Sequence, residues 1–276
     1  MEPTIVITGA TSGLGRAAAL ALARRGARIV VTARDAAKAA VLERETGADV
    51  HLGDFARLDD VRRLGAEIAD RHTRIDVLIN NAGLHAAEAR TTPDGLPEMV
   101  AVNYLAPWLL TQALLPALHH SPGGRIVTVT SEASRRHSAL RLPESLTETV
   151  PFSARTSAEH YGMTKLLDIM FTMELSRQLA GSTVTANCAD PGFTTTGLGR
   201  ELRFARPLEM VLTRLGIGDP ARSAGLLVTL AVDPEFAGRS GRYYTAGGTR
   251  EIQPAPPGDD PALQAQLWYE TEHLLS

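Results

Sequence analysis

Short apolar runs alternate with segments of helical periodicity along most of this chain, and the alternation limits the folds it can adopt. The runs are rich in β-branched residues and apolar on both faces, as strands are when helices cover both sides of a parallel sheet. We predict strands over 4–8, 28–32, 49–52, 77–80, 125–130 and 183–189, and helices over 14–25, 36–45, 58–71, 96–118 and 161–179. This order indicates an α/β fold with one doubly wound parallel sheet and right-handed crossovers.

Length and composition are those of one ordinary globular domain. The chain has 276 residues, of which 44% are apolar, enough to bury a sizeable core. We predict a single domain over 1–276, in which the proline-rich stretch 254–261 is a loop before a last helix at 262–275. The 28 basic and 31 acidic residues give a net charge of −3, which offers no support for nucleic-acid binding.

Cysteine usage and the N-terminus bear on the cellular compartment. Cys188 is the only cysteine, so the sequence allows no internal disulfide and no multi-thiolate metal site. The adjacent His119 and His120 would point to different faces of a helix, and no metal site is predicted. The N-terminus has neither a basic region nor a long apolar run and does not resemble a signal peptide. We expect a cytoplasmic protein without a membrane anchor.

One stretch, between Glu98 and Arg125, contains no Asp, Glu, Lys or Arg and has to be compared with a membrane span. It includes two prolines, Pro107 and Pro116, and the amide side chain of Asn103, which suit a lipid-facing helix poorly. We therefore expect a helix that is buried in the fold or between subunits.

A glycine-rich turn follows the first predicted strand and opens the first predicted helix. The turn has the spacing Gly-x-x-x-Gly-x-Gly and comprises Thr8, Gly9, Ala10, Thr11, Ser12, Gly13, Leu14 and Gly15. Glycines allow a tight turn and the close approach of a pyrophosphate, while the helix N-terminus offers unpaired N–H groups. Such a turn can be purely structural, but its place at the first strand–helix junction indicates a dinucleotide site.

The residues after the second strand bear on which dinucleotide binds. Arg34 lies about 20 residues beyond the glycines, where a chain that binds NAD carries a carboxylate for the ribose 2′-hydroxyl. Arg34 and a second cation, Arg16, suit a 2′-phosphate, which predicts NADP(H). Asp35 follows directly and keeps NAD(H) as the less favoured alternative, and both arginines could also be plain surface residues.

Tyr161 and Lys165 are four residues apart near the start of a predicted helix, so their side chains share one face. An ammonium near a phenol favours the phenolate, so we expect a lowered Tyr161 pKa and a general acid/base suited to an alcohol–carbonyl pair. Ser131 follows a predicted strand, and ligands of doubly wound sheets bind beyond the carboxyl ends of strands. A surface helix pair and a turn serine are the alternatives without a catalytic role.

In their order along the chain these motifs resemble the short-chain dehydrogenase/reductase family, over about residues 4–250. The resemblance rests on Gly9, Gly13, Gly15, Asn80-Asn81-Ala82-Gly83, Asn103, Ser131, Tyr161, Lys165 and Pro191-Gly192. It implies a Rossmann fold and an enzyme that interconverts a carbonyl and an alcohol. In such an enzyme the cofactor supplies hydride, and the protein supplies orientation and a proton.

The resemblance also implies a role for each matching residue. Tyr161 would be the acid/base, Ser131 would orient the substrate oxygen, and Lys165 would bind the nicotinamide ribose and lower the Tyr161 pKa. Asn103 would hold a water that links Lys165 to solvent. Further cofactor contacts would come from Asp54, Phe55, Asn81, Ala82, Gly83, Pro191, Gly192, Thr194 and Thr196. Asp54 could instead cap the helix at 58–71.

Within the family the chain is similar to the retinol-dehydrogenase-like branch. The similarity lies in residues 165–175, in Leu267-Trp268, in Arg34-Asp35 and in the 30-residue gap (161 − 131) between Ser131 and Tyr161. This branch implies NADP(H) and bulky lipophilic substrates. Thr130 and Asp190 depart from the branch pattern, and its frequent membrane anchor is not seen, so we expect secondary metabolism or detoxification rather than a membrane-bound retinoid enzyme.

Two segments that flank the predicted site, residues 132–160 and 194–217, resemble the family least. The first has balanced acidic and basic residues, which implies no charged substrate; a solvated loop is the alternative. The pattern of the second segment predicts an amphipathic helix. This helix could close over the cleft, with Leu208, Met210 and Leu212 on its inner face, or it could pack as an ordinary helix.

Together these observations predict an NADP(H)-dependent oxidoreductase that interconverts a carbonyl and an alcohol on a lipophilic small molecule. The same site could reduce a C=C or C=N bond or catalyse a non-redox step. A non-catalytic NADP(H) sensor or scaffold is the alternative outside enzymes, and the complete set of catalytic motifs argues against it. The helices at 96–118 and 161–180 are apolar on more than one face, which predicts a homodimer or homotetramer, unless the helix at 262–275 covers them.

Overall fold

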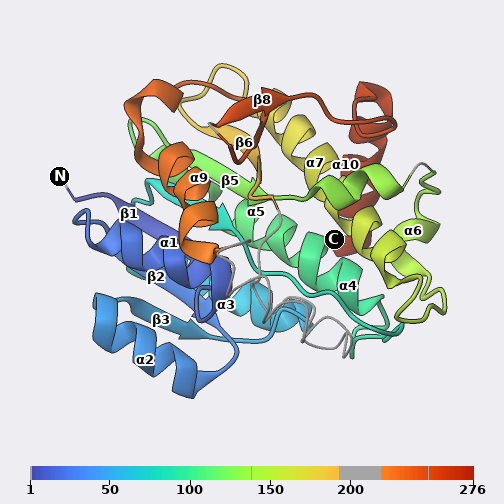
Figure 1. The fold of residues 1–276 in the computed structure, drawn as a ribbon, viewed down its shortest axis with the longest axis horizontal. Helices are drawn as coiled ribbons and strands as arrows, with labels where there is room; N and C mark the ends of the chain where they lie inside the picture. Colours follow the sequence, from blue (N-terminus) through green and yellow to red (C-terminus); the bar gives the residue numbers. More distant parts are fainter. Residues whose placement is uncertain (1, 138, 193–218, 248) are drawn as a thin grey trace.

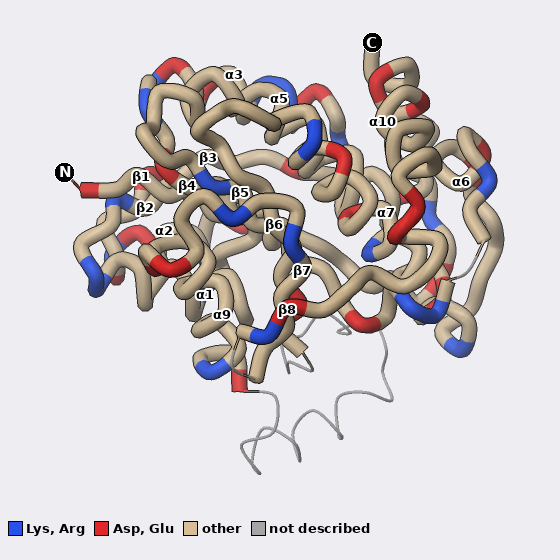
Figure 2. The backbone as a smooth tube through the Cα atoms, turned by 90° about the horizontal axis from the view of Figure 1, so that it is seen from above, with Lys and Arg blue, Asp and Glu red and all other residues tan. Residues whose placement is uncertain are grey.

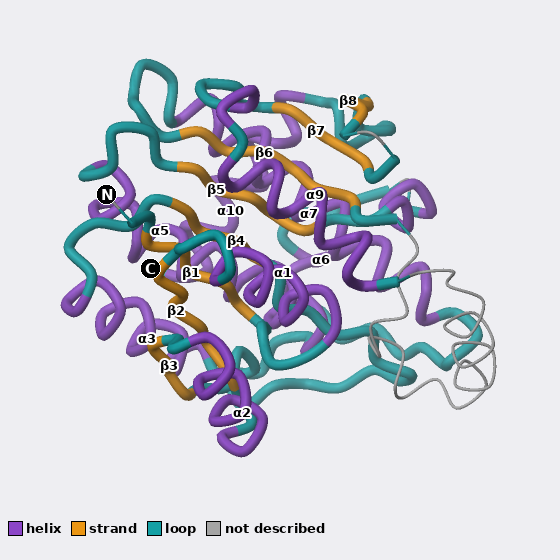
Figure 3. Tube along the Cα trace, turned by 60° about the vertical axis from the view of Figure 1, so that its left-hand side comes forward, coloured by secondary structure: helices purple, strands orange, loops and turns teal. Residues whose placement is uncertain are grey.

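In the computed structural model, which describes residues 2–137, 139–192, 219–247 and 249–276, eight strands form one sheet of order β3-β2-β1-β4-β5-β6-β7-β8 (Figures 1 and 3). The strands are β1 (Thr4–Thr8), β2 (Arg28–Ala33), β3 (Asp49–Leu52), β4 (Val77–Asn80), β5 (Arg125–Val129), β6 (Thr185–Asp190), β7 (Arg242–Thr245) and β8 (Arg250–Ile252). The first seven pair in parallel, which confirms the doubly wound fold. β8 is antiparallel to β7, so the sheet is not parallel throughout.

Helices cover both faces of the sheet, as Figure 3 shows. One face carries α1 (Gly13–Ala23), α2 (Ala36–Thr46) and α9 (Pro220–Val232), and the other carries α3 (Leu58–Arg71), α5 (Ala106–His119) and α7 (Ser157–Gln178). Each layer buries its own apolar cluster against the sheet. The carboxyl ends of β1, β4, β5 and β6 therefore meet at one edge, where a ligand of such a sheet binds.

Most predicted elements form within a few residues of the predicted bounds, but the segment 96–118 is not one regular helix. It divides into α4 (Glu98–Val100), a π-helical turn, η1 (Ala101–Leu105), and α5. A π-turn inserts an extra residue into the helix and displaces the backbone around it, a feature often found at functional sites. Here the displaced turn carries Asn103.

Several elements were not predicted. They are α9, β7, β8 and the short helices η2 (Glu132–Arg136), α6 (Glu144–Thr147) and η3 (Pro234–Phe236). The β8 strand has three residues, two of them exposed, so it lacks the apolar run by which a buried strand is recognised.

The last helix, α10 (Pro261–Leu275), covers the apolar surface of α5 and α7. Trp268 stacks on Phe171 of α7 with ring centroids 6.0 Å apart, and the Tyr104 hydroxyl lies 2.6 Å from Thr271 Oγ1. Subunit pairing through this face, one basis of the predicted oligomer, would require α10 to move. The oligomeric state itself stays a prediction.

The segment Glu98–His119 is the one candidate membrane span among the described residues, judged by length and composition. Its most apolar window is 72% buried inside the fold, as expected for a core helix. Figure 2 shows acidic and basic residues interspersed along the described chain, in line with the nearly balanced composition.

Candidate active site

The glycine-rich turn leaves β1 and enters α1 at the carboxyl edge of the sheet. Gly9 and Gly13 have φ angles of +66° and +55°, a region that side chains disfavour. Ser12 is the N-cap of α1, and its side chain makes no capping hydrogen bond, so the first N–H groups of the helix are available to a ligand. A Cβ at Gly15 would overlap the Asn81 amide, so the turn packs closely against the segment after β4.

Asn81 joins these two segments. Its Nδ2 donates to the Thr8 carbonyl oxygen at 2.8 Å, and the N–H groups of Asn81 and Ala82 both donate to Thr8 Oγ1 at 2.9 Å. Thr8 is fully buried. These hydrogen bonds hold the glycine-rich turn as an open cradle at the N-terminus of α1. The shape of this cradle and the free N–H groups of the helix fit the pyrophosphate of a dinucleotide.

The residues predicted to choose between NADP(H) and NAD(H) lie at the ends of β2 and β3. Arg34 is 74% exposed, with its guanidinium 4.0 Å from Asp54 Oδ2. Asp35 caps α2 by accepting from the Lys38 N–H at 3.1 Å, and the Lys38 ammonium lies 3.0 Å from its carboxylate. Asp35 is thus already engaged, while Arg34 faces solvent.

Two residues on this side make contacts that the local sequence does not show. Arg16 donates to Glu45 near the end of α2 in a half-exposed ion pair, and its contact with a phosphate stays a prediction. Asp54 does not cap α3, because its Oδ1 accepts from the Ala56 N–H at 3.0 Å and Asp94 accepts from the Leu58 N–H instead. Phe55, next to Asp54, is buried in the core. Both arrangements arise from contacts between residues far apart in the sequence.

Ser131 and Tyr161 come from two elements, η2 and α7, that pack against each other. Ser131 lies just beyond β5 and is the N-cap of η2, with its Oγ accepting from the Ala133 N–H at 3.2 Å. The hydroxyl proton of Ser131 remains available to a substrate oxygen. Gly162 permits this packing, since a Cβ there would overlap the Ala133 carbonyl oxygen.

Tyr161 lies in the first turns of α7, half-buried. The His85 ring stacks on it with centroids 4.7 Å apart, and His85 Nε2 lies 3.1 Å from Ser157 Oγ. The pKa of Tyr161 is raised, not lowered as predicted. Burial is the largest cause; the Lys165 charge opposes it, and Asp168 and Asp190 reinforce it.

The Lys165 charge does not outweigh this burial, and the contacts of Lys165 show why. Its Nζ is buried, donates to Asp168 Oδ2 at 2.8 Å and to the Val129 carbonyl at 2.9 Å, and lies 5.9 Å from the centre of the Tyr161 ring. Burial alone would lower the Lys165 pKa, but Asp168 and Tyr161 raise it overall. The ammonium next to Tyr161 is therefore half of an ion pair, which weakens its pull on the phenol.

Asp168 and Asp190 are two buried carboxylates that no motif singled out as catalytic. Burial raises the pKa of Asp168 to about 6 against the opposing charge of Lys165, and its Oδ1 has no hydrogen-bond partner among the described residues. Burial likewise raises the pKa of Asp190, whose Oδ1 accepts from the Gly192 N–H at 2.8 Å. Cys188, on β6, is fully buried.

Asn103, in the π-turn, is nearly fully buried beside the same helix. Its Nδ2 donates to Thr164 Oγ1 at 2.9 Å and to the Leu84 carbonyl at 3.0 Å, while its Oδ1 accepts from the Leu84 N–H at 2.8 Å. These three bonds fix the amide in place, and the water relay that the resemblance implied for Asn103 stays a prediction. Asn103 holds the loop after β4 against α7.

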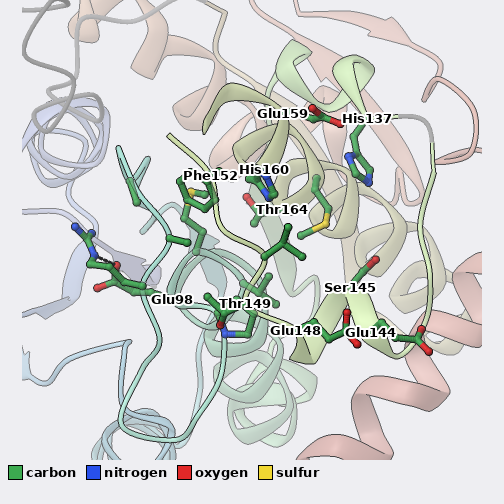
Figure 4. Close-up of a pocket in the computed structure, with 18 of the residues that line it drawn as sticks. Glu98, His137, Glu144, Ser145, Glu148, Thr149, Phe152, Glu159, His160 and Thr164 are labelled. Carbon is green, nitrogen blue, oxygen red and sulfur yellow. Dashed lines mark hydrogen bonds and ion pairs between the residues drawn. The ribbon is translucent and has the colours of Figure 1, made fainter. Parts of the chain in front are cut away.

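A pocket of about 340 Å³ opens beside the α7 turn that carries Tyr161 (Figure 4). Thr164 lines it and donates through Oγ1 to the Tyr161 carbonyl at 2.8 Å, and Phe152 stacks on His160 in its wall with centroids 4.4 Å apart. Its apolar lining includes Ala86, Ala89, Met99, Val100, Val150 and Met163. The segment 132–160, which could have been a solvated loop, forms a wall of this pocket.

Among the predicted contacts after β6, Pro191 is buried and Gly192 has a φ of +71°. Thr194, Thr196 and the predicted lid helix within 194–217 lie outside the described residues. Sequence reasoning missed His85, Asp168 and Gly162. Asp168 had a signal, its i,i+3 spacing from Lys165, and Gly162 had another, a glycine inside a helix. His85 had none.

Comparison with known proteins gives consistent matches over the whole chain. The family model described as short chain dehydrogenase matches residues 3–143. Human retinol dehydrogenase 13 is 33% identical over 99% of this chain and 84% of its own length. DnrU of Streptomyces sp. (strain C5), whose name assigns it provisionally to C-13 ketoreduction of daunorubicin, is 35% identical over 96% of this chain and 90% of its own.

Solved structures show the same fold. An uncharacterised protein from Mycobacterium paratuberculosis aligns with a TM-score of 0.77 at 31% identity, over 99% of this chain and 93% of that one. A Shigella flexneri protein determined in complex with NADP aligns with a TM-score of 0.68 at 23% identity, over 88% of this chain and 96% of that one.

Proposed function

The chain belongs to the short-chain dehydrogenase/reductase family of oxidoreductases that act on alcohols and carbonyls, and we propose that it is an NADP(H)-dependent member acting on a lipophilic small molecule. One observation carries the proposal. The cradle braced by Asn81 and the Tyr161–Lys165 face of α7 lie at the same carboxyl edge of the sheet, with Ser131 between them in the chain. One site can therefore bind both a dinucleotide and a substrate oxygen.

In this proposal the bound nicotinamide supplies hydride for the carbonyl carbon. Ser131 donates a hydrogen bond to the substrate oxygen and holds it facing Tyr161. Tyr161 then gives its phenolic proton to that oxygen as reduction proceeds, and takes it back in alcohol oxidation. Lys165, anchored by Asp168 and the Val129 carbonyl, stabilises the phenolate left behind.

Arg34 supports the choice of NADP(H). It is the exposed guanidinium at the end of β2, whereas Asp35, the carboxylate that would favour NAD(H), is engaged by the Lys38 N–H and ammonium. The Shigella flexneri relative in complex with NADP points the same way. Arg16 is paired with Glu45, so the choice rests on Arg34.

Arg34→Ala is expected to weaken NADPH binding roughly tenfold, the loss of one charge-assisted hydrogen bond at an exposed site. NADH binding should not change, because NADH has no 2′-phosphate. Fluorescence titration of both nucleotides into wild type and variant measures this, with the exposed Arg25→Ala as matched control. Tighter binding of NADH than NADPH by the wild type would contradict the assignment and make Asp35 the ribose ligand.

The pocket beside α7 supports a substrate with an apolar body. Apolar side chains from the loop after β4, from α4 and from α7 line it, and α7 reaches from it to Tyr161. Glu98, which also lines it, is paired with Arg90, and burial lowers the pKa of His160 and favours its neutral form. The names of similar proteins, a retinol dehydrogenase and a ketoreductase of daunorubicin, describe bulky substrates of this kind.

Filling this pocket should discriminate between substrates by size. Ala139 lines the pocket from an exposed position, so Ala139→Trp can fill it without disturbing the core. We expect kcat/KM to fall roughly tenfold or more for bulky carbonyls, since one or two lost methylene contacts account for that much, and to stay unchanged for small ones. Ala265→Trp, at an exposed position of α10, is the control. Equal losses for large and small carbonyls would place the substrate elsewhere.

A further inference from the structure

Three side chains with metal-ligating atoms meet at the end of the sheet opposite to the active site. Asp49 begins β3, His51 lies two residues further along the same strand, and His72 is the C-cap of α3. One ligand atom from each lies within 4.8 Å of the other two. Asp49 Oδ2 is 3.0 Å from His72 Nε2 and 3.5 Å from His51 Nε2.

Both imidazoles are buried, and two of the atoms that point away from the cluster have charged neighbours. His51 and His72 are 4% and 9% exposed. The Glu67 carboxylate lies 3.7 Å from His51 Nδ1, and the Arg71 guanidinium lies 3.3 Å from Asp49 Oδ1. A carboxylate behind a histidine ligand is the usual second contact at metal sites, because it orients the ring and makes the free nitrogen a better ligand.

The contacts of the described residues do not explain why His51 Nε2 is buried. It is fully buried and has no hydrogen-bond partner among the described residues, although buried polar atoms are nearly always paired. A simple hydrogen bond between His72 and Asp49 accounts for His72 and leaves His51 unsatisfied. An ion at the centre of the three atoms would satisfy His51 Nε2 and replace the bond between the other two.

We propose that Asp49, His51 and His72 form a binding site for a divalent transition-metal ion, with Zn²⁺ the best fit. Two imidazoles and one carboxylate suit zinc and its neighbours rather than Mg²⁺ or Ca²⁺, which prefer oxygen ligands. Tetrahedral zinc with bonds of about 2.0–2.1 Å holds its ligand atoms roughly 3.3 Å apart, close to the two separations at Asp49 Oδ2. Water would complete the fourth position.

The site's role would be structural, since it lies far from Tyr161. It joins edge strand β3, which pairs only with β2 in the described sheet, to the end of α3. Beyond its carboxyl end, β3 leads to Asp54, at the side of the predicted adenosine. Bound metal would thus strengthen the most weakly held strand on the nucleotide side of the sheet. The chemistry at Tyr161 should not depend on it.

The test uses untagged full-length protein freed of metal by chelator and titrated with Zn²⁺ calorimetrically and with Co²⁺ by visible absorption. We expect a single saturable equivalent, the absorption bands of tetrahedral Co²⁺, and a rise of Tm by roughly 5 °C at saturating Zn²⁺. His51→Gln should weaken the affinity for Zn²⁺ at least about tenfold and abolish the rise in Tm. His119→Gln, an exposed histidine on α5, is the control and should bind like wild type.

Two results would overturn the proposal. One is the absence of a saturable equivalent and of tetrahedral Co²⁺ bands in the wild type, a readout that does not depend on any variant folding. The other is a folded His51→Gln protein that binds Zn²⁺ as tightly as the wild type. Reductase activity is not a readout here, so the failure of this proposal and that of the proposed function remain distinguishable.

Discussion

Tyr161→Phe is expected to lower kcat/KM for carbonyl reduction by ~10²–10⁴-fold, the contribution usual for a positioned general acid or base. The substitution removes only the hydroxyl. The phenyl ring still stacks on His85, and the Lys165 ammonium keeps its bonds to Asp168 and the Val129 carbonyl. NADPH binding and the unfolding midpoint should therefore stay as in the wild type. Steady-state rates, a fluorescence titration and thermal unfolding of the same preparations measure the three quantities.

Tyr104→Phe is the matched control for this experiment. Tyr104 also carries a buried hydroxyl, bonded to Thr271 of α10, so its loss should affect stability and leave catalysis alone. Activity retained by Tyr161→Phe would exclude Tyr161 as the proton donor. Equal losses in Tyr161→Phe and Tyr104→Phe would show that the first variant acts through the fold.

Asp168→Asn is expected to move the pH profile of alcohol oxidation to lower pH. Oxidation needs the Tyr161 phenolate, and the negative charge of Asp168 helps to hold the Tyr161 pKa above its usual range. The groups whose charges face Tyr161 are Lys165, Asp168 and Asp190. Removing one negative charge from this set favours the phenolate, so oxidation should rise with pH earlier than in the wild type. The asparagine oxygen can still accept from Lys165 Nζ.

Comparing Asp168→Leu with Asp168→Asn separates the effect of the Asp168 charge from the loss of a partner for Lys165. Asp168→Leu leaves the buried Lys165 ammonium without its partner, which should cost ~3–5 kcal/mol of unfolding free energy. Asp168→Asn should lose much less. The pKa of Tyr161 can also be measured without substrate, from tyrosinate absorbance as the pH is raised. The contribution of Tyr161 is the difference in absorbance between Asp168→Asn and Asp168→Asn/Tyr161→Phe. An unchanged or higher pKa in Asp168→Asn would contradict the electrostatic account of this site.

The sequence predicted what depends on local pattern. Strand–helix alternation predicted the doubly wound sheet, and β1, β3, β4 and α3 form at the predicted bounds. The Tyr161–Lys165 spacing predicted a shared helix face, which the structure shows. These features follow from periodicity and from where strands end, and both can be read within a few residues.

What the sequence could not predict depends on burial and on contacts between distant residues. Lys165 was expected to act on Tyr161 alone, but Asp168, one helical turn further along, shares its charge in a buried site. Arg16 pairs with Glu45, 29 residues away, a contact that no local pattern indicated. The π-turn at Asn103 has no period of its own in the sequence, so the segment 96–118 read as one helix.

The central claim is that hydride passes between a bound nicotinamide and a carbonyl carbon under the control of Tyr161. The most direct measurement supplies NADPH carrying deuterium at nicotinamide C4, on either face in separate runs, with a panel of lipophilic carbonyls, and analyses the products by mass spectrometry. The account predicts alcohol that carries deuterium on the former carbonyl carbon from one of the two labelled cofactors, and none above background with Tyr161→Phe. Deuterium in a reduced C=C or C=N bond, or NADPH binding with no transfer to any carbonyl, would contradict it.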